Sequence, residues 1–309
     1  MKEIGGFMEL EIPYHQNYYP YAIRLNSARN CLRRLVRSLN ISKIYIPAYT
    51  CPTVWECLAD EGCKILFYNL NEDFTPDLQI NSSDFFLYTN YFGVCDRQVY
   101  ALSKIYDNMI VDNSQAFFSS PSIARYSFNS PRKFFGLPDG GLLFGDVSSD
   151  IQLQDVSLKR FSHLVERIEL GANAAYENFK KSDASLDNEP IKQMSKLTSK
   201  LLDAVDYPTV IKKRRENYLY LHRYLCKKNE LNVSLLDTEV PMVYPFLIKG
   251  KGRTLKQQLI ANKIYVATYW SGQKDMGFGR ALEEDLVPLP IDQRYGFEDM
   301  QRILKVLNI

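Results

Sequence analysis

Short apolar runs alternate with segments of helical periodicity between residues 24 and 146. The expected strands are 43–47, 64–68, 85–89, 109–111 and 141–145. Alternation of this kind is typical of βαβ units, which build a parallel or mixed sheet covered by helices on both faces. The sequence therefore predicts an α/β fold with a central, mostly parallel sheet.

Beyond residue 150 the pattern becomes mainly helical, and strands return after Leu231. The expected helices are 194–205, 210–227, 255–262 and 297–307, and the expected strands are 241–248 and 264–269. The polar segment 181–190 predicts an exposed loop. We expect an N-terminal arm and a large domain in residues 1–205, and a linking helix and a small C-terminal α+β domain in residues 206–309.

The composition is that of an ordinary globular chain, because 309 residues with 46% hydrophobic side chains can bury a large core. The formal net charge of +2 provides no broad field for nucleic acid or an anionic membrane. No apolar stretch approaches the roughly 18 residues that span a bilayer, and the N-terminus lacks a signal-peptide profile. We therefore expect a cytoplasmic protein that binds neither nucleic acid nor membrane.

A metal site is not expected. The six cysteines form no C-x-x-C pair and are interpreted as reduced thiols. The histidines are His15, His163 and His222, far apart in the sequence. Neither a zinc site nor a Ser-His-Asp triad is supported by this spacing.

The residues between Asn108 and Gly141 predict a specific chemistry. An apolar strand ends at Asp112, Gln115 follows, and Lys133 lies in a serine-flanked loop before a Gly-Gly pair. A lysine forms a Schiff base with an aldehyde cofactor, and a carboxylate facing a pyridine nitrogen keeps the ring protonated, so that it accepts electrons. Each residue alone is more often a turn former or a solvated charge. Their combined order predicts a pyridoxal phosphate site in an enzyme that acts on amino groups.

A phosphate group would need main-chain N–H groups at a helix N-terminus. A helix is expected to begin near Ser27, where the turn consists of Ser27, Ala28, Arg29 and Asn30. An ordinary serine-capped helix start is the alternative interpretation. Ligands of open α/β sheets bind outside the carboxyl ends of the strands, where Asp112 is expected, and this favours the phosphate site.

At these residues the chain resembles the DegT/DnrJ/EryC1/StrS family of sugar aminotransferases, which depend on pyridoxal phosphate and have fold type I. The matching motifs are Ser27–Asn30, Ile46–Pro52, Asn90–Gly93, Asp112–Ala116, Ser127–Phe128 with Lys133, and Gly140–Gly141. The resemblance covers most of the chain. It implies a large cofactor-binding domain followed by a small C-terminal domain.

The resemblance also implies a role for individual residues. Lys133 links to the cofactor and shuttles protons, and Asp112 pairs with the pyridine nitrogen. Gln115 contacts the ring hydroxyl, and Ser127 contacts the phosphate. Because Ser127 lies six residues before Lys133, one more than the family spacing, Ser130 is an alternative phosphate ligand.

One family feature is replaced in this chain. Cys51 stands approximately where the family has an aromatic ring that stacks on the cofactor. Tyr49, Tyr91 or Phe92 would supply that ring instead.

By this resemblance the chain is expected to be an aminotransferase that moves an amino group from an amino acid, with glutamate as the expected donor, to a nucleotide-linked keto-sugar for polysaccharide biosynthesis. A homodimer is expected, with active sites at the interface and residues 181–190 reaching across. The alternative is a regulatory fold-type-I protein that binds pyridoxal phosphate or a nucleotide-sugar without turnover.

Overall fold

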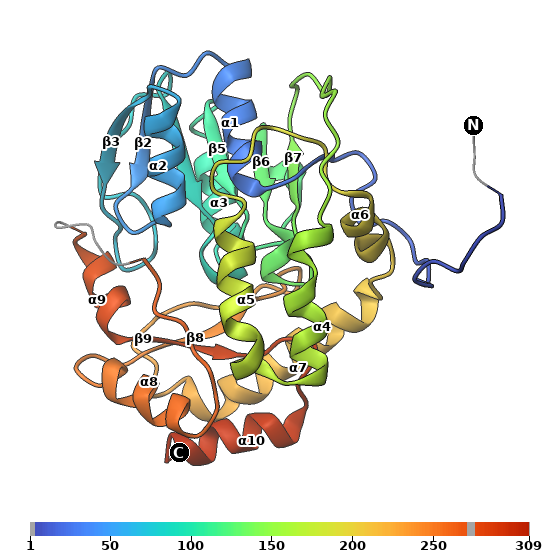
Figure 1. Cartoon of the computed structure of the whole chain (residues 1–309). Helices are drawn as coiled ribbons and strands as arrows, with labels where there is room; N and C mark the ends of the chain where they lie inside the picture. Colours follow the sequence, from blue (N-terminus) through green and yellow to red (C-terminus); the bar gives the residue numbers. More distant parts are fainter. Residues whose placement is uncertain (1–3, 271–275, 309) are drawn as a thin grey trace.

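A seven-stranded sheet with helices on both faces forms the centre of the computed structural model, which describes residues 4–270 and 276–308 (Figure 1). Its strand order is β1-β7-β6-β5-β4-β2-β3. Strands β2 to β6 pair in parallel, whereas β7 and β1 are antiparallel to their neighbours. The strands are β1 Ile23–Leu25, β2 Lys43–Pro47, β3 Lys64–Tyr68, β4 Phe85–Thr89, β5 Met109–Asp112, β6 Tyr126–Asn129 and β7 Gly141–Phe144.

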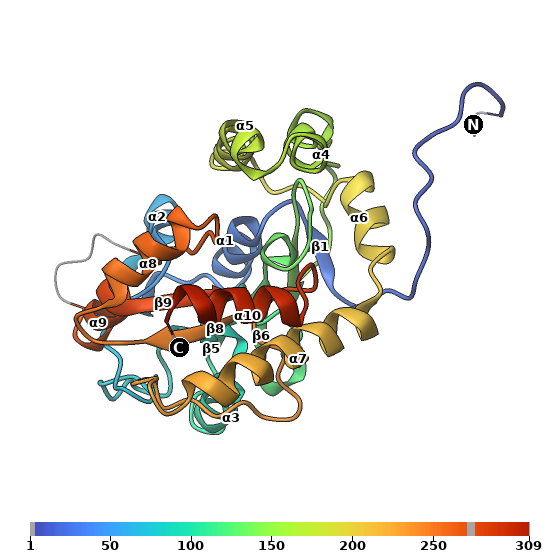
Figure 2. The ribbon, with the colours of Figure 1, turned by 90° about the horizontal axis from the view of Figure 1, so that it is seen from below.

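The described helices fall into three groups. Three belong to the βαβ region: α1 Ala28–Ser38, α2 Pro52–Asp60 and α3 Asp96–Ser103. Three follow the sheet, α4 Ser162–Glu169, α5 Ala172–Ala184 and α6 Lys196–Asp203, and α4 and α5 form a hairpin at one side of the molecule (Figure 2). The C-terminal part contains α7 Tyr207–Leu225, α8 Gly252–Ala261, α9 Phe278–Asp285 and α10 Phe297–Val306, with a two-stranded sheet of β8 Val243–Leu247 and β9 Leu286–Pro290.

Successive side chains of the central strands point into two different cores, as the two-residue period of a strand requires. Leu87 and Ile110 pack with the buried side chains of α1 and α2. Their neighbours Tyr88 and Val111 belong to the core on the other face. That second core also contains Tyr244 of β8, so the C-terminal part and the sheet share one hydrophobic core.

The predicted α/β fold with a central, mostly parallel sheet is confirmed, and β2 and β3 have the expected bounds. The strand expected at 264–269 is wrong, because that segment forms no strand and β8 pairs with β9 instead. The sequence did not predict β9 as a strand because Leu286–Pro290 contains two prolines, and proline in a sheet is normally confined to edge strands. The predicted domain boundary falls directly before α7, and we retain that division as a proposal.

The expectation of an exposed loop at 181–190 is also wrong in part. Helix α5 continues to Ala184, and Leu186 is buried. In the described part of the chain, none of the helices combines the length and the apolar character that crossing a bilayer requires.

We expect Gly141→Ala to destabilise the protein by about 2 kcal/mol, because overpacking of a closed site costs this order of free energy. A Cβ atom at Gly141 would collide with the main chain of Ser27 and lie 2.6 Å from the nitrogen of Ala28. Gly136→Ala is the matched control, since its Cβ would meet Leu164 at an ordinary 3.6 Å. Urea unfolding of both variants gives the measurement, and equal stabilities would contradict the close approach.

Candidate active site

The carboxyl ends of β2, β4, β5 and β6 meet at one edge of the sheet because these strands run parallel. Along this edge, several buried side-chain atoms have no hydrogen-bond partner among the described residues. They are Tyr49 Oη, Thr50 Oγ1, Thr89 Oγ1, Gln115 Nε2, Ser127 Oγ and Asn129 Oδ1. Buried polar groups are normally paired, and leaving one unpaired costs about 1–3 kcal/mol. Their concentration at this edge indicates a site for a polar ligand.

Asp112 ends β5 at the centre of this edge and is buried. Its Oδ1 accepts a hydrogen bond from the main-chain N–H of Ser114 at 2.8 Å. Burial raises the pKa of Asp112, and the positive charge of Lys133 and the Ser114 hydrogen bond oppose this rise. The structure therefore brings Lys133 within electrostatic reach of Asp112, as the sequence predicted.

The side chain of Gln115 has a defined orientation. Its Oε1 accepts a hydrogen bond from the main-chain N–H of Phe92 at 2.9 Å. The amide nitrogen is consequently directed away from Phe92, and it is buried without a partner among the described residues. Gln115 thus presents a hydrogen-bond donor to a ligand at this edge.

Lys133 lies at the end of a short 3₁₀ helix, η3 Pro131–Lys133, that follows β6. Its main-chain N–H donates to the carbonyl oxygen of Ser130 at 3.1 Å. Its side chain is exposed, whereas Phe134 and Phe135 directly after it are buried. The turn is therefore anchored by its aromatic neighbours while the amino group stays accessible.

The start of α1 matches the expected anion-binding turn. The Ser27 hydroxyl oxygen accepts the N–H of Asn30 at 3.1 Å, which caps the helix. The N–H groups of Ala28 and Arg29 occupy the first two helical positions, where no intrahelical acceptor exists. These two groups, together with the helix dipole, can bind an anion.

The side chains of Arg29 and Asn30 are used elsewhere. Arg29 forms an ion pair with Asp187 at 2.8 Å and donates to the carbonyl oxygen of Leu186 at 3.0 Å. Asn30 Nδ2 donates to the carbonyl oxygen of Pro190 at 2.9 Å. Arg29 can therefore contribute to an anion site through its main-chain N–H, whereas the N–H of Asn30 already donates to the Ser27 hydroxyl.

These contacts show what residues 181–190 bind within their own chain. The second half of this segment contacts the α1 turn, and its expected reach to a second subunit stays a prediction. Asn26 and Lys192 exchange hydrogen bonds, since Asn26 N–H donates to the Lys192 carbonyl oxygen at 3.0 Å and Lys192 N–H donates to Asn26 Oδ1 at 3.3 Å. The segment after α5 is thus a support for the anion-binding turn.

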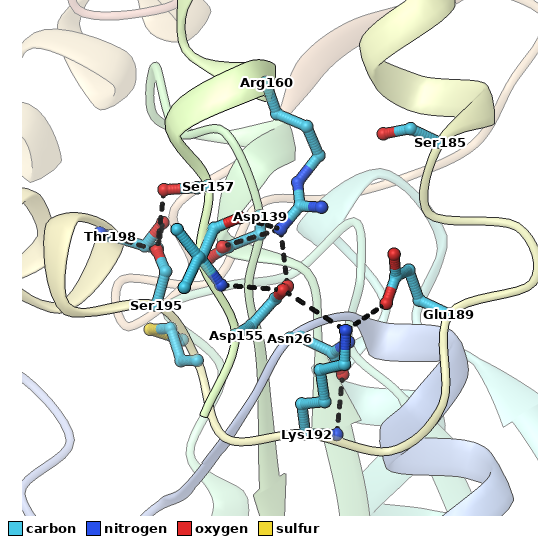
Figure 3. Close-up of polar contacts among 12 residues, drawn as sticks. Asn26, Asp139, Asp155, Ser157, Arg160, Ser185, Glu189, Lys192, Ser195 and Thr198 are labelled. Atoms are coloured by element: carbon cyan, nitrogen blue, oxygen red, sulfur yellow. Dashed lines mark hydrogen bonds and ion pairs between the residues drawn. The ribbon is translucent and has the colours of Figure 1, made fainter. Parts of the chain in front are cut away.

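A partly buried ionic network extends this support to the corner before the Gly-Gly pair (Figure 3). Arg160 pairs with Asp155 and lies 3.5 Å from Asp139. Lys192 lies 3.8 Å from Asp155 and also pairs with Glu189. Burial raises the pKa of Asp139, and the Ser195 and Thr198 hydroxyls oppose this. Because the N–H of Gly140 donates to the Asn26 carbonyl oxygen at 2.8 Å, the network and the turn are connected.

The two candidate phosphate serines differ in environment. Ser127 Oγ is buried without a partner among the described residues, whereas Ser130 is only half-buried and its carbonyl oxygen accepts the N–H of Lys133. Ser127 is the better candidate for the phosphate ligand, because leaving its buried hydroxyl unpaired costs free energy.

Cys51 caps α2 through its main chain and is half-buried. The alternative stacking residues Tyr49, Tyr91 and Phe92 are all buried in one aromatic cluster with Phe74. Their rings pack mainly on one another. The structure thus leaves the stacking residue unassigned.

Sequence reasoning missed three of the unpaired groups at this edge, Thr50, Thr89 and Asn129. Thr89 ends β4 and pairs with Asp112, and Asn129 ends β6. The available signal was their position at the ends of parallel strands. Among the described residues, no group of His, Cys, Asp and Glu side chains is arranged to hold a metal ion.

Comparison with solved structures identifies the fold. The chain matches a DegT DnrJ EryC1 StrS aminotransferase from Brucella abortus with a TM-score of 0.63 and 14% identity, covering 93% of this chain and 85% of that one. It matches NtdA from Bacillus subtilis with its cofactor PMP bound (TM-score 0.68, 13% identity, 93% and 72% covered). It also matches DesI in the presence of its TDP-sugar product (TM-score 0.66, 14% identity, 93% and 79% covered).

The chain has the sugar aminotransferase fold. No protein-family model matches the sequence, and a search of curated proteins found no match either. The resemblance predicted from the sequence motifs is therefore confirmed through the three-dimensional fold.

We expect Asp112→Asn to stabilise the cofactor-free protein at pH 7. The raised pKa means that the folded protein binds a proton at Asp112 more readily than the unfolded chain, so stability falls as pH rises from about 3.9 through the raised value. The amide side chain carries no charge at any pH. The stability of the variant should therefore exceed that of the wild type at pH 7 and equal it below about pH 4. Melting temperatures across this pH range give the measurement, with exposed Asp146→Asn as control. A gain that is independent of pH would contradict the assignment.

Proposed function

We propose that this protein is a pyridoxal phosphate-dependent aminotransferase that moves an amino group from an amino acid to a nucleotide-linked keto-sugar. The observation that carries the proposal is the set of unpaired buried polar atoms at the carboxyl edge of the sheet, beside Asp112 and Lys133. These groups have the donors and acceptors that the cofactor's ring and phosphate need. The shared fold with sugar aminotransferases supports this proposal.

The site residues fit the cofactor group by group. Asp112 would hold the pyridine nitrogen, and Gln115 Nε2 would donate to the ring hydroxyl. Ser127 Oγ and the N–H groups of Ala28 and Arg29 would bind the phosphate. When bound, pyridoxal phosphate supplies a ring that accepts the electron pair left by deprotonation of the substrate carbon.

Lys133 has two tasks in this proposal. Its Nζ is the amine that would hold the cofactor covalently, and once displaced it takes and returns the proton of the reacting carbon. The exposed side chain on an anchored turn suits both tasks, because the turn fixes the main chain while Nζ can move. The carboxylate form of Asp112 would favour a positive charge at the pyridine nitrogen, and the positive charge of Lys133 favours that form of Asp112.

The substrates are assigned by similarity of fold. DesI was solved with a TDP-sugar product, and on that basis we extend a nucleotide-linked sugar to this chain. We propose glutamate as the amino donor from the resemblance to sugar aminotransferases. We place the enzyme in the cytoplasm, where its six free cysteines would remain reduced. We also propose that it acts in polysaccharide biosynthesis.

A second candidate is a protein that binds pyridoxal phosphate or a nucleotide-sugar without turnover. Cys51 favours it, because a small thiol replaces the ring expected to stack on the cofactor. A panel of nucleotide keto-sugars with glutamate distinguishes the two functions. Cofactor binding without amino transfer to any panel member would support the second candidate.

We also propose a homodimer. Large apolar side chains are exposed on and around the α4–α5 hairpin, with Leu158 80% and Ile168 83% exposed. Exposed apolar patches of this kind mark interaction surfaces, and two-fold dimers are the commonest assembly. A second copy of the chain would cover them.

Replacing Lys133 with Ala should abolish covalent cofactor capture and turnover and leave the fold intact, because the side chain is exposed. Protein mixed with pyridoxal phosphate and reduced with borohydride is digested and analysed by mass spectrometry. The wild type should carry the adduct on Lys133, and the Lys104→Ala control should do the same. Retained turnover in Lys133→Ala would refute the proposal.

The assembly can be tested by sedimentation velocity at micromolar concentration. We expect twice the 35.8 kDa mass of the chain. Ile168→Glu should shift the protein toward monomer, because it places a charge in the apolar patch. Tyr100→Glu, on an exposed apolar residue of α3, is the control. A wild-type monomer active with bound cofactor would refute the dimer.

A further inference from the structure

The buried side chain of Arg214 joins the C-terminal part of the protein to the turn that carries Lys133. Arg214 lies in α7 and is 1% exposed. Its Nη2 donates to the carbonyl oxygen of Phe134 at 3.3 Å, directly after Lys133. Its Nη1 donates to the carbonyl oxygens of Pro241 at 3.3 Å and Met242 at 3.1 Å, which lead into β8.

Gln293, which follows β9, completes this arrangement. Its Oε1 accepts from Arg214 Nε at 2.9 Å, and its Nε2 donates to the carbonyl oxygen of Phe134 at 2.9 Å. The Arg214 guanidinium also lies 4.5 Å from the centroid of the Phe134 ring. Both the main chain and the side chain of Phe134 are therefore held by these two residues.

The hydrogen bonds of Arg214 within the described chain all go to neutral acceptors. The nearby carboxylate of Asp292 instead pairs with Arg294, at 2.7 Å and 2.8 Å. Burial lowers the pKa of Arg214 to about 10. Burying a cation without a paired anion costs free energy, and an apolar side chain would fill the space at lower cost. Only a planar group with five donors can collect acceptors from three segments at once.

A second chain of hydrogen bonds leads from Arg214 to Gln115. The N–H of Met242 donates to the carbonyl oxygen of Phe92 at 2.8 Å, and the N–H of Phe92 donates to Gln115 Oε1 at 2.9 Å. Phe92 has a φ of +57°, a left-handed conformation that costs about 1–3 kcal/mol in a residue other than glycine. These contacts hold Phe92 in that conformation and thereby direct Gln115 Nε2 into the site.

We propose that Arg214 is a positioning residue that fixes the Lys133 turn and the Gln115 amide relative to each other. This inference rests on the proposed function, in which Lys133 and Gln115 would bind neighbouring groups of one cofactor, the aldehyde and the ring hydroxyl. Loss of the Arg214 side chain should loosen the turn and misplace Lys133 Nζ. A misplacement of about 1 Å lowers a reaction rate by roughly a hundredfold.

The test compares Arg214→Met and Gln293→Leu with the wild type. Hydrogen exchange of the cofactor-free protein reports on residues 131–137, where the N–H groups of Phe134 and Phe135 donate to the carbonyl oxygen of Pro131. Borohydride trapping reports the rate at which Lys133 captures pyridoxal phosphate. We expect faster exchange at 131–137 and capture slowed by roughly a hundredfold in Arg214→Met, with smaller changes of the same kind in Gln293→Leu.

Arg215→Met is the matched control. Arg215 is the next residue of α7 and also donates to two carbonyl oxygens, those of Leu236 and Glu239, away from the Lys133 turn. A general loss of packing would affect both arginine variants alike. Positioning predicts normal exchange at 131–137 and normal capture in Arg215→Met.

Two results would count against the inference, and they are distinguishable. If folded Arg214→Met and Gln293→Leu both show wild-type capture rates and wild-type exchange at 131–137, this inference is overturned and the proposed function is not affected. If Arg214→Met does not fold, half-buried Gln293→Leu carries the test. A wild-type protein that captures no pyridoxal phosphate would overturn the proposed function and this inference together.

Discussion

The parallel register of β4, β5 and β6 is the constraint on which the site depends. Pairing of Thr89 with Asp112, and of Asp112 with Phe128, brings the ends of these strands to one edge. Strands that run parallel end on the same side, so every polar residue that follows one of them enters the same small volume. Asp112 at the end of β5, Gln115 just after it, and Lys133 after β6 lie at this edge for this reason. A change of one residue in this register would turn Asp112 into the opposite core.

The site is stabilised from two sides rather than by its own contacts. Several of its polar atoms have no hydrogen-bond partner in the described part of the chain, and Asp112 is buried, so these groups lower the free energy of unfolding. On one side, the segment around Lys192 and the Asp155–Arg160 pair supports the start of α1. On the other side, the C-terminal part packs into the same core as the sheet and holds Phe134 through Arg214. Stability is therefore supplied by the surroundings, and the polar edge remains available for a ligand, as is common at functional sites.

The local pattern of the sequence predicted those elements whose periodicity and caps are strong. The helix at Ser27 begins where its capping residue indicates, and β2 has the bounds expected from its apolar run. Prediction failed where tertiary partners decide the structure. Residues 264–269 have the character of a strand but pair with no strand among residues 4–270 and 276–308, whereas Leu286–Pro290 pairs with β8 despite its two prolines. Strand formation depends on a neighbour in space, which local propensity does not specify.

For the site, the sequence alone was enough to predict a chemistry. An acid at a strand end, a following glutamine, and a lysine before two glycines were enough to predict an electron-accepting cofactor, because each group matches one part of it. Only the tertiary structure decided how these groups are held. Arg214 lies 81 positions beyond Lys133 in the chain, and its contact with Phe134 follows from the packing of α7 against β8. The direction of the Gln115 amide likewise depends on Phe92, and residues 186–190 contact the α1 turn of the same chain. Such contacts join distant segments, and no local pattern encodes them.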